Sequence, residues 1–160
     1  MWSDAAGWSY GGRGDAGKPE YNYVKEVDYS SGAASLIPRK LWEQIGGFDE
    51  RFAPAYYEDT DLAFEVRKAG YRVVYQPLSK VIHFEGVSNG TDVTGTGLKR
   101  YQVENSKKLR EKWAEESQNQ YKNTDNPDPF RARERSRVTH ILLLVDTYAP
   151  TSHTHPGPTA

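Results

Sequence analysis

The segment of residues 45–83 constrains the fold and the chemistry more than any other part of this sequence. It reads IGGFDERFAPAYYEDTDLAFEVRKAGYRVVYQPLSKVIH, so clustered acids and aromatics are followed by a helix signal, two strand signals and a histidine. Its five carboxylates are Asp49, Glu50, Glu58, Asp59 and Asp61. Acids gathered where a loop becomes a helix are typical of a functional site and not merely of a core.

Apolar periodicity predicts an α/β arrangement around this segment. Helices are predicted over residues 38–45, 60–69 and 98–116, the last with its stripe at Leu98, Tyr101, Asn105, Leu109 and Trp113. Partial alternation and β-branched or aromatic residues predict strands over residues 23–29, 71–75 and 80–84. Residues 30–34 have small side chains that either pack tightly or let a ligand approach the backbone.

Composition divides the chain of 160 residues into one α/β unit with an arm and a tail. Residues 1–22 are rich in glycine and aromatics and predict an ordered loop or a loose arm. Residues 23–117 carry the helix and strand signals, and residues 118–137 form a polar and basic linker. Residues 138–160 begin with a buried-type strand, which predicts the truncated start of a following domain or a disordered tail.

Charge and cysteine content narrow the classes of function. Twenty-one Lys and Arg residues against 22 Asp and Glu residues give a formal net charge of -1, so no global field recruits nucleic acid or an anionic membrane. The absence of cysteine excludes disulfides, thiol catalysis and thiolate zinc sites. The longest aliphatic run, residues 141–145, is too short to span a membrane. These features predict a cytoplasmic protein without a transmembrane segment, with the inner face of the membrane as a second location.

Glu58 and Asp59 stand at the predicted start of a helix. Unpaired backbone N–H groups and the positive end of the helix dipole hold a carboxylate ionised there. An ionised, oriented carboxylate beside aromatics can accept a proton from a sugar hydroxyl. The alternative interpretation is an ordinary acidic helix cap. If the aspartate were isolated, that interpretation would be preferred.

The surrounding sequence favours a functional carboxylate over a helix cap. Four motifs occur in a fixed order: GGFDE at 46–50, YYEDTDL at 56–62, GYRVVYQP at 70–77 and VIH at 81–83. Together they resemble the acceptor-side half of family 2 glycosyltransferases, over roughly residues 24–90. The resemblance implies a partial GT-A (Rossmann-like) fold, a mixed sheet with flanking helices, in which the N-terminal nucleotide-binding half is missing. The run at 140–146 resembles the opening of a second glycosyltransferase domain.

The resemblance also implies roles. It implies inverting transfer from a nucleotide-sugar donor to a carbohydrate acceptor with Mn²⁺ or Mg²⁺, in bacterial surface polysaccharide synthesis. Asp59 is the expected general base, and Glu58 orients it or touches the acceptor. The remaining expected site residues are Trp42, Gly46, Gly47, Phe48, Asp49 and Tyr57 for the acceptor, and His83 for the metal. Asp59 and Asp61 spell Asp-x-Asp, but because they open a helix we assign Asp61 to stabilising the helix start.

Two other functions are weighed against this one. A non-catalytic carbohydrate-binding or assembly module would use the same aromatics with structural carboxylates. Nucleic-acid binding by the arginines of residues 131–137 is disfavoured by the balanced charge, and a solvated linker explains them better. Because the nucleotide-binding half is expected to be missing, we expect the chain alone to be inactive.

Overall fold

The computed structural model describes residues 1–7, 19–82, 96–125 and 135. The elements, in chain order, are η1 (Pro19–Tyr21), β1 (Lys25–Glu26), α1 (Arg39–Ile45), η2 (Glu50–Phe52), α2 (Glu58–Lys68), β2 (Val74–Tyr75), η3 (Leu98–Arg100), α3 (Tyr101–Lys112) and α4 (Ala114–Gln118). His83 and the predicted strand over residues 138–145 lie outside the described residues. Within the described part, no helix combines the length and the apolar character needed to cross a membrane.

Helix α1 confirms the prediction over residues 38–45. Pro38 precedes it with φ of -60°, a value that the proline ring fixes and that suits a helix start. Gly46 ends it in the left-handed region with φ of 84°, and its N–H donates to the carbonyl of Trp42. A side chain at Gly46 would be strained in this conformation, so the glycine defines where the helix stops.

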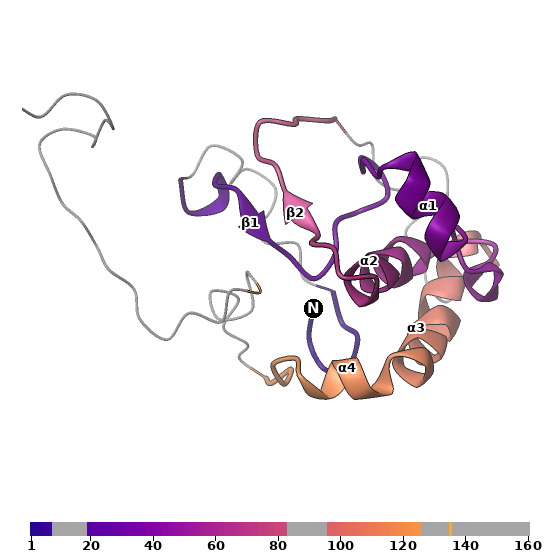
Figure 1. Ribbon diagram of the computed structural model, residues 1–160. Helices are drawn as coiled ribbons and strands as arrows, with labels where there is room; N and C mark the ends of the chain where they lie inside the picture. The colour runs from indigo at the N-terminus through magenta and orange to yellow at the C-terminus, as the bar shows by residue number, and fades with distance from the viewer. Residues whose placement is uncertain (8–18, 83–95, 126–134, 136–160) are drawn as a thin grey trace, which may run out of the picture.

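Helix α2 is the centre of the molecule (Figure 1). It begins two residues earlier than the predicted 60–69, with Glu58, Asp59 and Asp61 in its first turn and Arg67 and Lys68 in its last. Acids at the start and bases at the end both complement the helix dipole. Its buried apolar residues are Leu62, Ala63, Phe64 and Val66.

The sheet is smaller than predicted. β1 and β2 pair antiparallel, with Lys25 opposite Tyr75 and Glu26 opposite Val74. The strands predicted over residues 23–29 and 71–75 shorten to these two-residue elements, and residues 80–82 form no strand. A strand persists only where a neighbour satisfies its N–H and C=O groups. The predicted mixed sheet is therefore a single antiparallel pair among the described residues.

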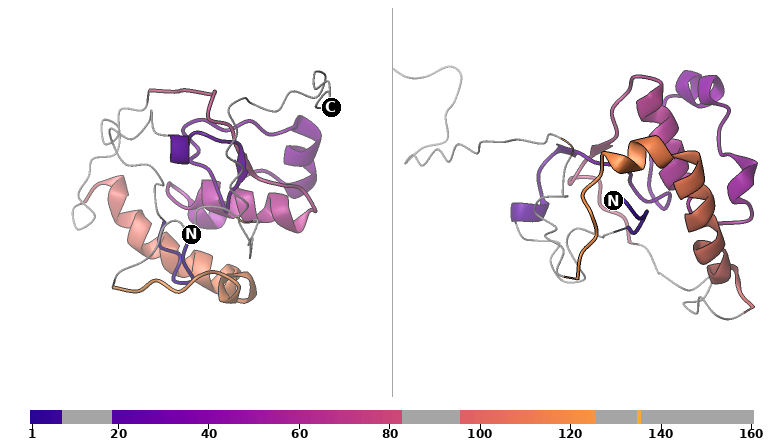
Figure 2. Two further views of the ribbon diagram at one scale, coloured as in Figure 1. Left: turned by 90° about the vertical axis from the view of Figure 1, so that its left-hand side faces the viewer. Right: turned by 90° about the horizontal axis from the view of Figure 1, so that it is seen from below.

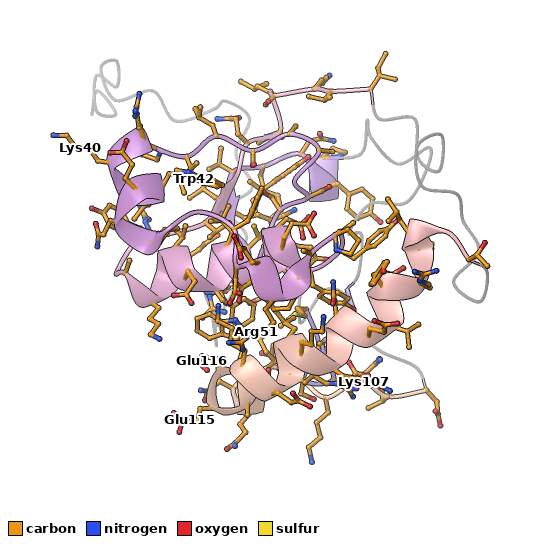
Figure 3. The ribbon with its side chains drawn as sticks, turned by 90° about the vertical axis from the view of Figure 1, so that its right-hand side faces the viewer. Lys40, Trp42, Arg51, Lys107, Glu115 and Glu116 are labelled. Carbon is orange, nitrogen blue, oxygen red and sulfur yellow. The ribbon has the colours of Figure 1, made fainter. Side chains whose placement is uncertain are left out.

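The core lies where α2, α3 and the first residues of the chain meet. It contains Met1, Ala5, Phe52, Phe64, Leu109 and Trp113, against which Tyr29 and Tyr57 pack. Of the stripe predicted over residues 98–116, Asn105, Leu109 and Trp113 are buried, whereas Leu98 is exposed. The single predicted helix is instead divided into η3, α3 and α4, with a break at Trp113. Figures 1 and 2 show α3 and α4 bending around one side of α2, with the first residues of the chain lying between α4 and the strands. The outer faces of these helices carry charge, and Lys107, Glu115 and Glu116 point away from the body of the molecule (Figure 3).

A group of charges joins α3 to α2. The Lys112 ammonium lies 2.9 Å from Asp49, 2.9 Å from Asp61 and 3.0 Å from Glu65. The indole N–H of Trp113 donates to Asp61 Oδ1 over 2.7 Å. Burial by itself would lower the pKa of Lys112, but its hydrogen bonds to the three carboxylates raise that pKa above its ordinary value. Asp61 lies in the first turn of α2, but its side chain, which we assigned to stabilising the helix start, bonds to Lys112 of α3 and to Trp113 instead.

Candidate active site at the start of helix α2

Two tyrosines in an unusual conformation introduce α2. Tyr56 has φ of 74° and Tyr57, the residue that caps the helix, has φ of 71°. The left-handed region costs a residue with a bulky side chain about 1–2 kcal/mol, so two in succession need support from their surroundings. Strain of this kind concentrates at functional sites. Here it lies directly before Glu58 and Asp59.

The Asp59 carboxylate is held at both oxygens. Oδ2 accepts the backbone N–H of Gly32 over 2.8 Å, and Oδ1 accepts the N–H of Thr60 over 2.7 Å and its hydroxyl over 3.2 Å. A Cβ at Gly32 would lie 3.2 Å from the Asp59 Cβ, closer than side chains normally pack. Of the two interpretations of the small residues at 30–34, the contact of Gly32 with Asp59 is tight packing within the chain, and the approach of a ligand remains a prediction.

Glu58 differs from its neighbour. It is half-buried, and its Oε2 atom is buried without a hydrogen-bond partner among the described residues. Burial raises the pKa of Glu58, and the nearby Asp59 charge raises it further. Two adjacent carboxyl groups therefore have different environments, one bonded at both oxygens and one with an oxygen left over.

Two tyrosines flank the acids and stay protonated. Burial, followed by the charge of Asp59, raises the pKa of Tyr29 to about 12. Burial also raises the pKa of Tyr57, whose hydroxyl donates to the carbonyl of Ala5 over 3.3 Å. Tyr57, predicted to bind the acceptor, therefore directs its hydroxyl to the N-terminal segment and packs on the core. Tyr29 was not among the predicted site residues.

A cleft of about 910 Å³ opens beside Asp59. Its walls come from α1, α2, β2 and the segment of residues 27–38, and include Tyr29, Leu36, Leu41, Phe48, Asp59, Leu62, Val66, Tyr71 and Val74. Of the predicted site residues within the described part, Asp59 and Phe48 line it. The carboxylates of Asp28 and Asp59 and the basic side chains of Lys25 and Arg72 interrupt a wall that is otherwise largely apolar. Such a wall suits a ligand that presents a hydroxyl and the apolar face of a ring.

The predicted acceptor loop divides into two parts. Phe48 is 49% exposed and stands edge-on to Trp42, with ring centroids 5.0 Å apart and an interplanar angle of 83°. Gly47 has φ of 75°, and a Cβ there would lie 2.8 Å from the indole of Trp42, so these three residues form one packed unit. By contrast, Gly46 ends α1, and Asp49 accepts the N–H of Arg51 and pairs with Lys112. The hydrogen bond from Lys112 lowers the pKa of Asp49.

The described residues do not form a metal site. Within residues 1–7, 19–82, 96–125 and 135, no three Asp, Glu or His side chains are grouped so that they could hold a cation. Asp49, Asp61 and Glu65 do converge, but on the Lys112 ammonium. His83, the predicted ligand, lies outside the described residues. The expected Mn²⁺ or Mg²⁺ would thus need ligands from elsewhere.

Sequence reasoning assigned no site role to two residues that contact the site. Gly32 reaches Asp59 from 27 positions away, and Asn105 reaches the loop before α2 from α3. Nothing local to Gly32 identified its partner. Asn105 did give a signal, because an asparagine inside an apolar stripe is buried and must find hydrogen-bond partners.

The chain is similar to known glycosyltransferases. The sequence profile described as "Glycosyltransferase like family 2" matches residues 14–113. Over 68 residues the chain is 41% identical to the N-acetylglucosaminyl-diphospho-decaprenol L-rhamnosyltransferase of two Mycobacterium tuberculosis strains, CDC 1551 / Oshkosh and ATCC 25618 / H37Rv. This match covers 42% of the chain and 22% of those proteins.

A second relative is the uncharacterized protein y4gI of Sinorhizobium fredii. It is 32% identical over 72 residues, which cover 45% of the chain and 8% of that protein. No solved structure matches the chain. The chain therefore spans well under two thirds of the relatives that it matches. Because the family profile covers more than half of the 160 residues, the chain belongs to glycosyltransferase-like family 2.

Proposed function

We propose that the chain is the acceptor-side part of an inverting glycosyltransferase in which Asp59 is the general base. The observation that carries this proposal is the setting of Asp59, whose carboxylate lines the cleft and is bonded to the Gly32 N–H over 2.8 Å. Membership of glycosyltransferase-like family 2 supports sugar transfer as the reaction class.

The proposed reaction is a single displacement at the anomeric carbon of the donor. The acceptor hydroxyl gives its proton to the Asp59 carboxylate while its oxygen forms a bond to the anomeric carbon of the donor. The bond between that carbon and the nucleoside diphosphate breaks, and the diphosphate leaves with the electron pair. Each carboxylate oxygen has two lone pairs, so the bonds from Gly32 and Thr60 leave acceptor capacity for the substrate hydroxyl.

Glu58 and Phe48 are assigned supporting roles. The Oε2 atom of Glu58 has no hydrogen-bond partner among the described residues, and together with the raised pKa of Glu58 this suits a carboxyl group that contacts a sugar hydroxyl. The half-exposed Phe48, backed by Trp42, offers an apolar surface to the face of a sugar ring. Neither role requires the residue to exchange a proton with the substrate.

The donor is assigned to a nucleotide-binding half contributed by another part of the same polypeptide, which would complete a GT-A fold. The short match to the rhamnosyltransferases and the open apolar wall of the cleft both support this division. The described residues do not fit a metal site, and the proposed role of Asp59 as a base requires no cation. The cytoplasm, or the inner face of a bacterial membrane during surface polysaccharide synthesis, is the proposed setting.

The deciding experiment is the Asp59→Asn substitution in the complete gene product. The change removes the base and little volume, so we expect release of nucleoside diphosphate to fall at least about 100-fold. UDP-, GDP- and dTDP-linked sugars would be screened, including an L-rhamnosyl donor with an N-acetylglucosaminyl-diphospho-lipid, because the relative's name states that pair. Asp125→Asn, on an exposed residue, is the matched control. Full activity of Asp59→Asn would refute the proposal.

The half-exposed Phe48 on Trp42 also favours a second candidate, a non-catalytic carbohydrate-binding module. Calorimetric titration of the 160-residue chain separates the two functions. Sugar binding that needs neither UDP nor Mn²⁺ and that disappears in Phe48→Ala, together with full activity of Asp59→Asn, would support the module.

A further inference from the structure

Hydrogen bonds from α3 support the backbone conformation of the turn that precedes α2. Tyr56 and Tyr57 both occupy the left-handed region, which tyrosine does not favour by itself. Neighbouring contacts must therefore maintain the turn that leads into Glu58 and Asp59. Helix α3 supplies the most deeply buried of these contacts, through one asparagine.

Asn105 is completely buried, with 0% of its surface exposed. Its Nδ2 group donates to the carbonyl oxygens of Phe52 over 2.8 Å, Ala55 over 2.9 Å and Tyr56 over 3.0 Å. These carbonyls span the turn that precedes α2, and the last belongs to the first of the two strained tyrosines. One side chain thus holds three points of the turn from a helix about 50 positions further along the chain.

The amide is chemically specific for this position. Three carbonyl oxygens face the side chain, so it must present donors, and Nδ2 carries two hydrogens that the three acceptors share. Oδ1 is buried without a hydrogen-bond partner among the described residues. An aspartate would turn an oxygen toward the three carbonyls, and a leucine would leave all three unsatisfied. The donors of Asn105 are therefore what the turn uses.

From this geometry we infer that Asn105 is a positioning residue for the acid pair. By fixing the turn through Tyr56, it sets the direction in which α2 starts and so places the Asp59 carboxylate against the Gly32 N–H. The catalytic part of this inference rests on the proposed role of Asp59. The structural part, a link from Asn105 to the contact between Asp59 and Gly32, stands without it.

Other contacts between α3 or η3 and this loop are more exposed. The Lys108 ammonium donates to the carbonyl of Arg51 over 2.9 Å at the surface, and the Lys99 ammonium lies 4.9 Å from the ring centroid of Tyr56. Water competes for both groups, so neither fixes the backbone as a buried amide does. The Lys108→Ala variant therefore tests whether the loss of any contact between α3 and the loop disturbs the hydrogen bond between Asp59 and Gly32.

The first test is an NMR measurement on the 160-residue chain. The amide proton of Gly32 reports on Asp59 directly, because it donates to the carboxylate. In Asn105→Ala we expect this resonance to move upfield and its exchange with solvent to become at least about tenfold faster, as the hydrogen bond lengthens. Ser106→Ala and Lys108→Ala should leave it in place. An unchanged Gly32 resonance in a folded Asn105→Ala chain would overturn the inference, whereas a purely structural role would lower only the melting temperature.

The second test is rescue. Glycine occupies the left-handed region without strain, so Tyr56→Gly in the Asn105→Ala background should restore part of the Gly32 signal. If Asn105→Ala alone does not fold, the double variant and Asn105→Ser, which keeps one donor, take its place. Failure of all three to fold would reduce Asn105 to a core residue and refute the inference.

Turnover by the complete gene product separates this inference from the proposed function. We expect kcat to fall roughly 10- to 100-fold in Asn105→Ala with a smaller change in the acceptor KM, as for a displaced base. Full activity of Asp59→Asn would remove the proposed function and leave the NMR outcome standing. An inactive Asp59→Asn beside a fully active Asn105→Ala would instead remove the positioning role.

Discussion

The two sides of α2 differ in how completely they are packed. On the side of α3, Asp61 is 1% exposed and bonded to both Lys112 and Trp113, and the core closes around Phe64. On the side of the cleft, some large apolar residues of the wall face outward, with Leu36 99% exposed and Val74 46% exposed. The α3 side is therefore the more completely packed of the two, while the cleft side also offers surface to another molecule or chain segment.

This contrast explains how a strained site can persist. The two left-handed tyrosines and the partly unsatisfied Glu58 lie between the two sides, and their strain is offset by the packing behind them. Substitutions on the α3 side should accordingly reduce stability. Substitutions at the cleft should change chemistry with little effect on folding.

Among the charged residues, the largest expected effect is that of Lys112→Met. It removes the ammonium that Asp49, Asp61 and Glu65 share, and Arg51 remains 3.9 Å from Asp49 alone. Because Asp61 is buried, the change should lower the free energy of unfolding by about 3 kcal/mol. Urea unfolding followed by circular dichroism measures the change. Arg39→Ala breaks an exposed ion pair with Glu43 and should change stability by less than about 0.5 kcal/mol. Equal effects of the two variants would contradict the contrast between the two sides.

Gly32→Ala should affect the cleft side alone. The new methyl group would lie 3.2 Å from the Asp59 Cβ, so the carboxylate must move by a few tenths of an ångström. We expect kcat for sugar transfer to fall about tenfold, since small displacements of a base reduce turnover, with the melting temperature nearly unchanged. If Gly32→Ala instead loses much stability and keeps a normal kcat, Gly32 serves the packing of the fold and not the position of Asp59.

Glu58→Gln is expected to have a smaller effect on stability, and the change is an increase at neutral pH. Because burial raises the folded-state pKa of Glu58 above its unfolded value near 4.5, its contribution to stability is complete below that value and is lost as pH rises through the folded pKa. The glutamine side chain cannot ionise, so the variant should match the natural chain in stability at acid pH and exceed it at neutral pH. The gain should stay below about 1 kcal/mol, because Glu58 is only half-buried and water screens its charge.

Thermal melts between pH 3.5 and 7.5 would measure this difference. Glu115→Gln, at an exposed residue on α4, controls for the loss of a surface charge. If Glu58→Gln is less stable than the natural chain at neutral pH, the ionised Glu58 has a stabilising partner. The Glu58 carboxylate would then not be a source of strain at this site.

Local signals predicted the bounds of α1 and the buried face of α3 well. Pro38 and Gly46 marked the ends of α1, and the apolar stripe gave Leu109 and Trp113 as core residues before any tertiary contact was considered. These signals work because helix caps and helical periodicity depend on residues within a few positions of one another.

Long-range contacts could not be predicted in the same way. Nothing in Tyr56 or Tyr57 favours a left-handed backbone, and the support that allows it comes from Asn105 on another helix. The Gly32 contact with Asp59 likewise joins residues 27 positions apart. The strands shortened for the same reason, because a strand extends only as far as a neighbour pairs with it. Acidic residues at α2 were therefore found from sequence, and their arrangement was not.

The smallest expected change in stability tests the open side itself. Leu36→Ser replaces an apolar side chain that is already 99% exposed, so the free energy of unfolding should change by less than about 0.5 kcal/mol. Leu109→Ala, at a core residue that is 1% exposed, is the contrasting variant and should lose about 2–5 kcal/mol. Sedimentation equilibrium on the 160-residue chain should also show less self-association for Leu36→Ser, because an exposed apolar patch promotes contact between copies. If Leu36→Ser is instead strongly destabilising, Leu36 is covered in solution, and the cleft side is as closed as the side that faces α3.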